Sequence, residues 1–404
     1  MNRWAGKDLA RRAVLAVALL GGCAVVPTPS GSDGPSGTAR PSPSTTELWA
    51  AHPQPSNPMS EADRAAIDAA ATAALALSDG ATALYVGIWN PEKGFYLQAY
   101  GESSHGVPAA LGDHSRIGSV TKTFTATAVL ELVARGQISL DDTVGELLPE
   151  LTAEFPVLAT VTVKQLLGMR TGIGDFFCCP GSLVETYFAD PSQEFTVNEL
   201  IASGLQFGSP SATPLASSDY SSTNYLILGE ILRAVTGRSA GEVVTDVARA
   251  AGLQQTALST GTMPEPATHG YLGAAQVAEH HDLLPEGTVA GTDVSGWSVS
   301  FAGPAGGMYS TLGDLGAWAA SGFGSALLPV DLADERLTPP DGRDYDYGYG
   351  ITVYHDWIGH SGLVEGWIVD TAFNATTGAT WVLIVNSGGG EAILQGMAAF
   401  AQPN

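Results

Sequence analysis

The chain has 404 residues, 45% of them hydrophobic, and a formal net charge of −24. This length predicts one large enzyme domain with an insertion or about two domain-sized units, with enough apolar residues for a sizeable core. Because so acidic a chain repels phosphate backbones and no basic patch offsets the repulsion, the charge argues against nucleic-acid binding and is otherwise typical of a soluble protein.

The N-terminus predicts an export signal. Its basic residues are Arg3, Lys7, Arg11 and Arg12. The apolar run AVLAVALLGG that follows is too short to cross a hydrocarbon core of about 30 Å as a stable helix. Since Arg11-Arg12 loosely resembles a twin-arginine signal, the general secretory route and the twin-arginine route both stay open.

The run Leu20-Gly21-Gly22-Cys23 resembles a bacterial lipobox. In that reading residues 1–22 are a lipoprotein signal peptide, and two acyl chains on Cys23 anchor the protein at about 0.8 kcal/mol per buried CH₂. The alternative is an ordinary signal peptide with an incidental cysteine. Residues 23–58 are rich in Pro, Ser and Gly and predict a tether. We therefore expect an extracytoplasmic, lipid-anchored protein of the bacterial cell envelope, with the membrane as a partner.

The folded part is expected over residues 59–404. Ser60 is a candidate N-cap of an Ala-rich helix over residues 60–77. Two β-prone runs, 82–90 and 94–101, are separated by PEKG and predict a β-hairpin. Apolar residues at helical spacing then predict a helix that begins near Lys122 and ends at Gly136.

The pattern changes after this helix. Residues from about 140 to 290 indicate short helices and loops, and strand signals return near the C-terminus, at residues 347–354, 364–373 and 380–387, followed by a helix over 390–402. Strands at both ends predict a sheet built from both termini, with a helical region inserted between them. We place the α/β part at 59–140 and 290–404, and the helical part at 141–289.

Two adjacent cysteines, Cys178 and Cys179, lie in the helical region. Outside the cytoplasm thiols tend to be oxidised. A vicinal disulfide, two free thiols and an intermolecular bond all stay open. No further cysteine completes a thiolate metal site, so no metal is expected here.

The pair Ser119 and Lys122 stands in IGSVTKTF, three residues apart and thus on one helix face. A serine hydroxyl needs a base to become a nucleophile, and Lys122 serves only if burial lowers its pKa well below about 10.4. The alternative is a helix-capping serine beside a solvated lysine. Of the four lysines only Lys122 follows a serine by three positions, and small and apolar residues flank it, which favours the catalytic reading.

Further motifs appear in a fixed order. RIGSVTKTFTATAVLELVARGQISLDDTVGELLPE is followed by VTVKQLLGMRTGI, by Tyr220 in YSSTNYLILGEILRAVTG and by His360-Ser361-Gly362 in GHSGLVEGW. Together they resemble the family of class C β-lactamases, D-alanyl-D-alanine carboxypeptidases and related esterases, the penicillin-binding-protein-like serine hydrolases, over residues 60 to 400. The resemblance implies an α/β (α+β) fold: an antiparallel sheet from the N- and C-terminal segments with helices on both faces, plus an inserted all-helical subdomain.

The resemblance also implies roles for the site residues. Ser119 would be the nucleophile, Lys122 the base in acylation, and Tyr220 the group that moves a proton to the leaving group and helps to activate water. His360, Ser361 and Gly362 would lie on the strand that borders the site. The N–H groups of Ser119 and Leu363 would form an oxyanion hole, each donor worth about 3 kcal/mol.

Two residues depart from the family pattern. Ser222 stands where the family's Y-x-N motif has asparagine, and a hydroxyl offers fewer donors and a shorter reach to the substrate than an amide. His360 stands where many members have lysine, and neutral histidine carries no charge to grip a substrate carboxylate. Both departures argue against a dedicated β-lactamase.

Other hydrolase classes lack their motifs. No G-x-S-x-G elbow occurs, because GHSGL ends in Leu363. The acids and histidines of AEHHD, Glu279 to Asp282, lack the H-E-x-x-H spacing of a zinc site and read as a polar loop.

We therefore expect a serine hydrolase that works through an acyl-enzyme without metal or cofactor. Its expected substrates are D-Ala-D-Ala-type stem peptides of peptidoglycan, other D-amino-acid amides, or small esters, with weak or absent β-lactamase activity. The alternative is a catalytically weak or inactive envelope lipoprotein that uses the same fold for binding.

Overall fold

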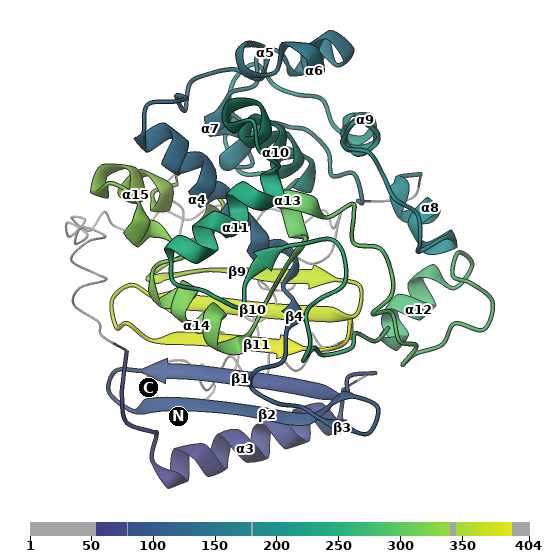
Figure 1. The fold of residues 1–404 in the computed structure, drawn as a ribbon, viewed down its shortest axis with the longest axis vertical. Helices are drawn as coiled ribbons and strands as arrows, with labels where there is room; N and C mark the ends of the chain where they lie inside the picture. Colours follow the sequence, from purple (N-terminus) through teal and green to yellow (C-terminus); the bar gives the residue numbers. More distant parts are fainter. Residues whose placement is uncertain (1–53, 79, 179–180, 340–344, 390–404) are drawn as a thin grey trace, which may run out of the picture.

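The computed structural model describes residues 54–78, 80–178, 181–339 and 345–389. In these ranges the chain forms a large antiparallel sheet and a small one (Figure 1). The large sheet has the order β3-β2-β1-β11-β10-β9-β8-β7. Its strands are β1 (Ala83–Asn90), β2 (Gly94–Ser104), β3 (Val107–Pro108), β7 (Tyr345–Tyr347), β8 (Thr352–Tyr354), β9 (Trp357–Val364), β10 (Trp367–Asn374) and β11 (Thr380–Val385). The small sheet has the order β4-β6-β5, from β4 (Ser115–Arg116), β6 (Met308–Ser310) and β5 (Ala257–Leu258).

The large sheet joins the two ends of the folded chain. The predicted hairpin is present as β1 and β2, and β1 pairs on its other side with β11, where Leu84 faces Val385. The side-chain oxygen of Asn386 accepts hydrogen bonds from the backbone N–H groups of Thr82 and Ala83, at 3.0 and 2.7 Å. The predicted fold class is thereby confirmed.

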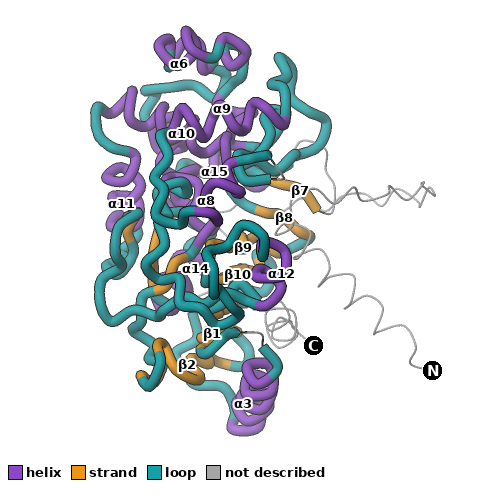
Figure 2. Tube along the Cα trace, turned by 90° about the vertical axis from the view of Figure 1, so that its right-hand side faces the viewer, coloured by secondary structure: helices purple, strands orange, loops and turns teal. Residues whose placement is uncertain are grey.

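The two faces of the sheet are covered by different helices. Helix α3 (Glu61–Ala76) lies against β2 and β1, as Figures 1 and 2 show, and its N-cap is Ser60, as predicted. Helix α14 (Leu312–Ala320) packs on the opposite face, over β1, β10 and β11. Because strand side chains alternate, Leu84 belongs to the core under α3 whereas Tyr85 belongs to the main core.

The helical region lies on the side of the sheet that faces away from α3, and it shares the main core with α14. Its central element is α4 (Thr121–Ala134), whose polar as well as apolar side chains are largely buried, as expected of a helix enclosed by others. The elements beside α4 are α10 (Ser222–Thr236), α11 (Ala240–Ala250) and α13 (Gly303–Gly306). The remaining helices are α5 (Val144–Leu147), α6 (Pro149–Glu154), α7 (Val163–Leu167), α8 (Leu183–Ala189), α9 (Val197–Phe207), α12 (Ala274–His280) and α15 (Val330–Leu337), with 3₁₀ turns η1 (Gly118–Val120), η2 (Pro156–Leu158) and η3 (Ser325–Leu327).

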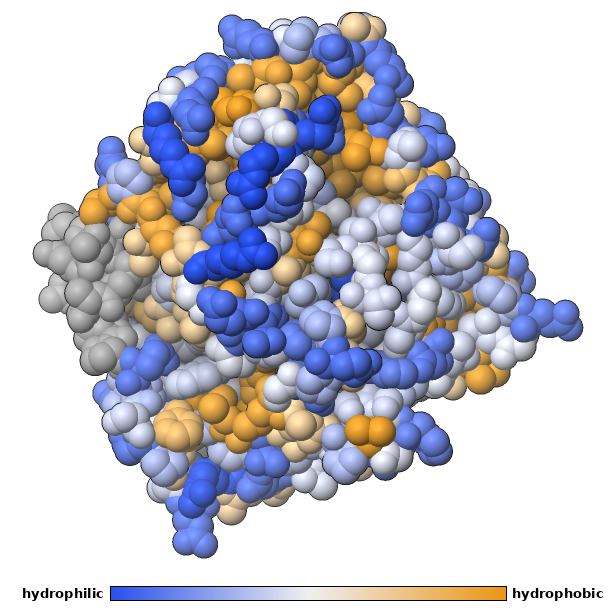
Figure 3. Space-filling model, viewed as in Figure 1, coloured by the Kyte–Doolittle hydropathy of each residue, from blue (hydrophilic) through white to orange (hydrophobic). Residues whose placement is uncertain are grey.

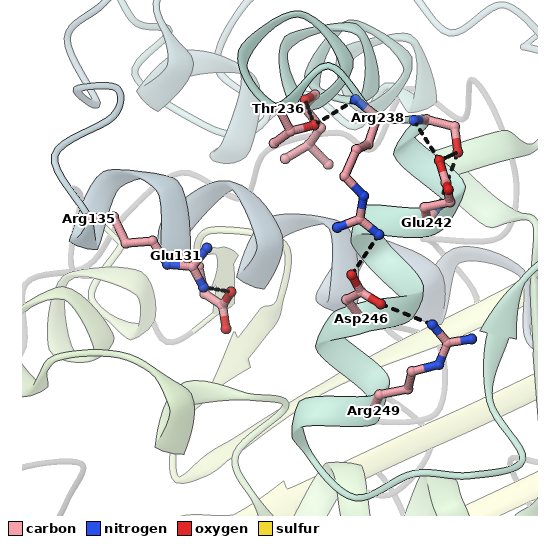
Figure 4. A network of polar contacts seen from close by, with 9 residues as sticks. Glu131, Arg135, Thr236, Arg238, Glu242, Asp246 and Arg249 are labelled. Atoms are coloured by element: carbon pink, nitrogen blue, oxygen red, sulfur yellow. Dashed lines mark hydrogen bonds and ion pairs between the residues drawn. The ribbon is translucent and has the colours of Figure 1, made fainter.

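The outer side of α11 is polar. Asp246 lies between Arg238 and Arg249, with N–O distances of 2.7 and 3.0 Å (Figure 4). On the face shown in Figure 3, strongly hydrophilic side chains form a band over this part of the molecule. Such exposed pairs are worth about 0–1 kcal/mol each, so they affect solubility more than stability. Among the described helices, none combines the length and the apolar character that a bilayer crossing needs.

Several expectations concern residues outside the described ranges. They are the signal peptide over 1–22, Cys23, most of the tether and the helix over 390–402. The lipid anchor and the proposed domain limits therefore stay predictions.

Candidate active site

Ser119 lies in the single turn η1, directly before α4, and β9 passes close beside this turn. Glycines permit the approach. A Cβ atom on Gly118, which has a φ of +48°, would lie 2.6 Å from the backbone nitrogen of Leu363. A Cβ on Gly362 would lie 2.0 Å from the carbonyl oxygen of Ile117 and 3.1 Å from the Ser119 nitrogen. The backbone nitrogens expected to form an oxyanion hole thus lie on segments in direct contact.

Ser119 does not act as a helix cap here. Neither η1 nor α4 has a side-chain capping hydrogen bond at its start. The serine hydroxyl instead contacts Lys122, whose Nζ lies 3.0 Å from Ser119 Oγ. The structure therefore brings together the two residues that the sequence motif singled out.

Lys122 is fully buried, and its amine has three neighbours. Besides Ser119 Oγ, Nζ lies 2.8 Å from the Ala305 carbonyl oxygen and 3.3 Å from Ser222 Oγ. Burial lowers the pKa of Lys122 to about 7, although the negative charge of Asp175 acts in the opposite direction. A neutral amine has two N–H donors and one lone pair. The donors suit the Ala305 carbonyl and the Ser222 hydroxyl, which leaves the lone pair for the Ser119 proton.

Tyr220 lies in the loop that leads into α10. Its ring centre is 4.9 Å from Lys122 Nζ. The Tyr220 ring also meets the Tyr347 ring edge-on, with centroids 5.8 Å apart, and lies 6.2 Å from the His360 ring. The structure thus groups the predicted residues Ser119, Lys122, Tyr220 and His360, which come from three separate segments of the chain.

Ser222 is the first residue of α10, and Asp175 fixes its backbone. The Ser222 N–H donates to one carboxylate oxygen of Asp175 at 2.6 Å, and the Phe177 N–H donates to the other at 2.9 Å. The sequence analysis did not identify Asp175, although it lies only two residues after the family-like stretch that ends in RTGI. Asn224 is buried away from this cluster, because its side chain bonds to Thr171 and Met169.

His360 is a buried residue of β9 with a defined tautomer. Its Nδ1 faces the backbone carbonyl of Ser361 at 2.5 Å, and because a carbonyl only accepts, Nδ1 carries the proton. Nε2, 2.9 Å from the Tyr347 hydroxyl, therefore accepts a hydrogen bond. Burial, together with the positive charge of Lys122, lowers the pKa of His360 to about 3. His360 is accordingly neutral at physiological pH.

Tyr347, which the sequence analysis did not identify, is held by a buried ion pair. Asp346 pairs with Arg170, and both side chains are at most 6% exposed. The second carboxylate oxygen of Asp346 accepts from the Ser218 hydroxyl at 2.7 Å, and Arg170 donates to the carbonyls of Leu215 and Ala216. These bonds join the strand of Tyr347 to the loop that carries Tyr220.

The other predicted positions are as follows. Ser361, Gly362 and Leu363 lie on β9, the strand that borders Ser119. Cys178 takes part in a disulfide, while Cys23 and Cys179 lie outside the described residues. Within the described ranges no group of histidine, cysteine or acidic side chains is suited to hold a metal ion.

Comparison with known proteins gives consistent matches. The Beta-lactamase family model matches residues 64–402. Penicillin-binding protein 4 of Amycolatopsis lactamdurans is 30% identical over 184 residues, which is 43% of this chain and 42% of that protein. The D-aminopeptidase of Gluconobacter oxydans is 25% identical over 281 residues, 66% of this chain and 48% of that protein. The chain thus spans less than half the length of these two relatives.

Two solved structures are also similar. The D-stereospecific amidohydrolase from Streptomyces sp. has a TM-score of 0.66 at 27% identity, covering 82% of this chain and 97% of its own. The D-amino acid amidase of Ochrobactrum anthropi SV3, solved with L-phenylalanine, has a TM-score of 0.69 at 24% identity, covering 83% and 96%. The second likeness concerns the fold alone.

Proposed function

The chain belongs to the Beta-lactamase family of serine hydrolases, and we propose that it hydrolyses amides or esters of D-amino acids through an acyl-enzyme on Ser119. One observation carries this proposal. A fully buried lysine, with a pKa lowered to about 7, lies 3.0 Å from the hydroxyl of Ser119. A base poised near the operating pH is what general-base activation of a serine needs.

The proposed reaction begins with proton transfer. Lys122 takes the proton of the Ser119 hydroxyl while Oγ bonds to the substrate carbonyl carbon. Negative charge develops on the carbonyl oxygen, facing the N–H groups of Ser119 and Leu363, which stabilise it by about 3 kcal/mol per donor. As the C–N or C–O bond breaks, Tyr220 delivers a proton to the leaving group and regains one from Lys122. Water then attacks the acyl carbon and gives a proton to the Lys122–Tyr220 pair. The bond to Ser119 Oγ breaks, and that proton returns to Oγ as the acid leaves.

The geometry around His360 favours amides and esters over peptides with a free carboxylate. A carboxylate-binding site needs a fixed positive charge, but His360 is neutral and its Nε2 accepts from Tyr347. Ser222 also takes the place of the asparagine amide that the family uses on the acyl side. The D-stereospecific amidohydrolase, the D-amino acid amidase and the D-aminopeptidase among the similar proteins support the same substrate class.

The location of this activity is also a proposal, and it rests on the sequence. With Cys23 acylated and residues 23–58 as a tether, the site would face the cell wall. Peptidoglycan fragments with D-amino acids would then lie within its reach.

Turnover by the full-length chain tests the function. We expect the wild type to release ammonia from D-phenylalaninamide faster than from L-phenylalaninamide, and to gain the mass of a fluorophosphonate probe. Ser119→Ala should do neither. If the wild type neither takes up the probe nor hydrolyses any D-amino-acid amide or ester, the proposal is wrong and the binding-module alternative holds.

A further inference from the structure

Glu365 is a buried acid that the proposed reaction does not use. It directly follows β9, two residues beyond Leu363, and is 7% exposed. Its Oε2 atom is buried and has no hydrogen-bond partner among the described residues. Because burying an unpaired polar group costs free energy, an acid in this condition points to a missing partner.

Tyr187 of α8 is a second group of this kind. Its ring is fully buried, and its hydroxyl also has no hydrogen-bond partner within the described ranges. Burial raises the pKa of Tyr187, and the charge of Glu365 raises it further, so the two groups lie within electrostatic reach of each other.

Packing also connects the two residues. A Cβ on Gly366, the residue after Glu365, would lie 2.7 Å from a methyl carbon of Val294. The Val294 carbonyl accepts from the Trp297 N–H at 2.9 Å, and the Trp297 ring lies 5.9 Å from the Tyr187 ring. The turn after β9 and helix α8 are thus linked through Val294 and Trp297.

Aromatic rings link Tyr187 to the segments that surround Ser119. The Tyr187 ring centre lies 4.9 Å from that of Phe301 and 5.5 Å from that of Phe177, and these two rings stack on each other. The Phe177 N–H donates to Asp175, which holds Ser222. Phe301 is followed by α13, whose Ala305 carbonyl accepts from Lys122. The aromatic group therefore borders the site on the side where β9 ends.

A carboxylate among aromatic rings suits a small cation. The carboxylate offers opposite charge and acceptor atoms, a tyrosine oxygen offers a further acceptor, and ring faces attract ammonium groups within about 6 Å. The net charge of −24 also draws cations toward the protein and repels anions. Asp175 is less suited, because both of its oxygens already accept backbone N–H groups.

The short separation of Glu365 from Leu363 along the chain is also consistent with a role for Glu365 in binding the substrate. Glu365 lies in the turn after β9, two residues after Leu363, so its Cα is at most about 7 Å from that of Leu363, whose N–H faces the reacting carbonyl in the proposed reaction. The amino group of an amino-acid substrate is attached one carbon from that carbonyl. This separation is within the reach of a glutamate side chain together with the substrate's own carbon–nitrogen bond.

We propose that Glu365 and Tyr187 bind the free ammonium group on the acyl side of the substrate. The preferred substrates are then D-aminoacyl amides and esters with an unblocked amino group, rather than acylated peptides. This inference rests on the proposed function.

Binding to a chain that cannot turn over tests the inference. The two ligands are D-phenylalaninamide and 3-phenylpropanamide, which differ only in the amino group, measured by calorimetry on full-length Ser119→Ala. We expect at least about tenfold tighter binding of D-phenylalaninamide, as for other charged hydrogen bonds. Adding Glu365→Gln should reduce this preference to about threefold or less. Adding Glu365→Asp, which keeps the charge on a shorter side chain, should give an intermediate preference.

Asp370→Asn is the matched control. Asp370 is a half-buried acid of β10, the strand that follows Glu365. Its carboxylate already accepts a hydrogen bond from Trp381 Nε1 at 2.9 Å, so its loss should leave the preference for D-phenylalaninamide intact. The inference is wrong if Ser119→Ala shows no preference for the ammonium ligand, or if a folded Glu365→Gln or Glu365→Asp variant keeps the full preference. These outcomes do not depend on hydrolysis, whereas failure of the proposed function would appear as absence of Ser119-dependent ammonia release by the wild type.

Discussion

The Tyr347 hydroxyl donates a hydrogen bond to Nε2 of His360, over 2.9 Å. With Nδ1 facing the Ser361 carbonyl, both ring nitrogens are occupied and the imidazole is held in one orientation. His360 therefore borders the site as a neutral, fixed group.

The first prediction concerns this contact. Tyr347→Phe leaves Nε2 of His360 buried without a donor, at a cost of about 1–3 kcal/mol in the free energy of unfolding. Since His360 also loses its fixed orientation, we expect kcat/KM for D-phenylalaninamide to fall about tenfold. Tyr85→Phe is the control, because it removes a buried hydroxyl that donates to Asp113 outside the site. If both variants lose stability and neither loses activity, Tyr347 has no positioning role.

The second prediction is a pH profile. Since only neutral Lys122 accepts the Ser119 proton, and its pKa is lowered to about 7, reactivity should fall as the pH drops through 7 and level off above it. The rate of labelling by an uncharged fluorophosphonate, between pH 5 and 9, measures this without titration of the substrate. A rate that keeps rising toward pH 10 would mean that Lys122 is an ordinary, solvated lysine.

The third prediction replaces the lysine by an uncharged residue of similar length. Lys122→Met should reduce the labelling rate at least about 100-fold. The effect of Lys122→Met on the stability of the fold should also depend on pH, in a direction that follows from the lowered pKa. Because the folded-state pKa lies below the ordinary 10.5, the buried charge destabilises the wild type fully below pH 7, and this effect fades as the pH rises from 7 toward 10.5. The melting temperature of Lys122→Met, relative to wild type, should thus be higher at pH 6 than at pH 9; the reverse order would contradict a buried lysine.

The fourth prediction concerns the stability of the ligand-free protein. Burial raises the pKa of Glu365 to about 7, from an ordinary 4.5. The folded state then binds the proton more tightly than the unfolded state, so this acid costs nothing below pH 4.5 and destabilises fully above pH 7. Glu365→Gln should raise the free energy of unfolding by about 3 kcal/mol at pH 8, and by little at pH 4.5. Urea denaturation measures both, with the exposed Glu286→Gln as a control that shows no such difference between the two pH values.

The fifth prediction concerns the N-terminus. If Cys23 is diacylated, the wild type should incorporate labelled palmitate and sediment with membranes, and Cys23→Ser should do neither. A Cys23→Ser chain that stays with the membranes would point to a different anchor.

The parts of the fold and of the site that could be predicted are those that local sequence patterns indicate. Two β-prone runs on either side of PEKG predicted the hairpin of β1 and β2. The serine and lysine came from a short motif, and the tyrosine and histidine from short motifs in the order of the family they resemble. Asp175 and Tyr347 could not be found in this way, because their partners lie in segments joined only by folding. Asp175 bonds to a backbone group 47 positions away, and Asp346, which supports Tyr347, pairs with a residue 176 positions away.

Apart from Lys122, whose small and apolar flanking residues favoured burial, the sequence did not indicate which charged residues are buried. Arg336 illustrates this: it is fully buried and donates to the Thr123 and Phe323 carbonyls, so it holds α4 in place behind Lys122. Charged residues are mostly exposed, and nothing in the sequence around Arg336 indicates that this arginine of α15 is buried. Only the packed structure shows which charges are enclosed.

The pairing of β1 with β11 affects when the protein can fold during its synthesis. Thr82 and Asn386, which bond across this junction, are 304 positions apart. During synthesis the hairpin of β1 and β2 emerges before β11 and exposes an unsatisfied strand edge until the roughly 300 residues between them have followed. Contacts between such remote segments make folding slow, since a long loop must close before they form. The site beside β9 can therefore assemble only late, once β1 and β11 have paired, and a polypeptide that stops before β11 lacks the complete sheet.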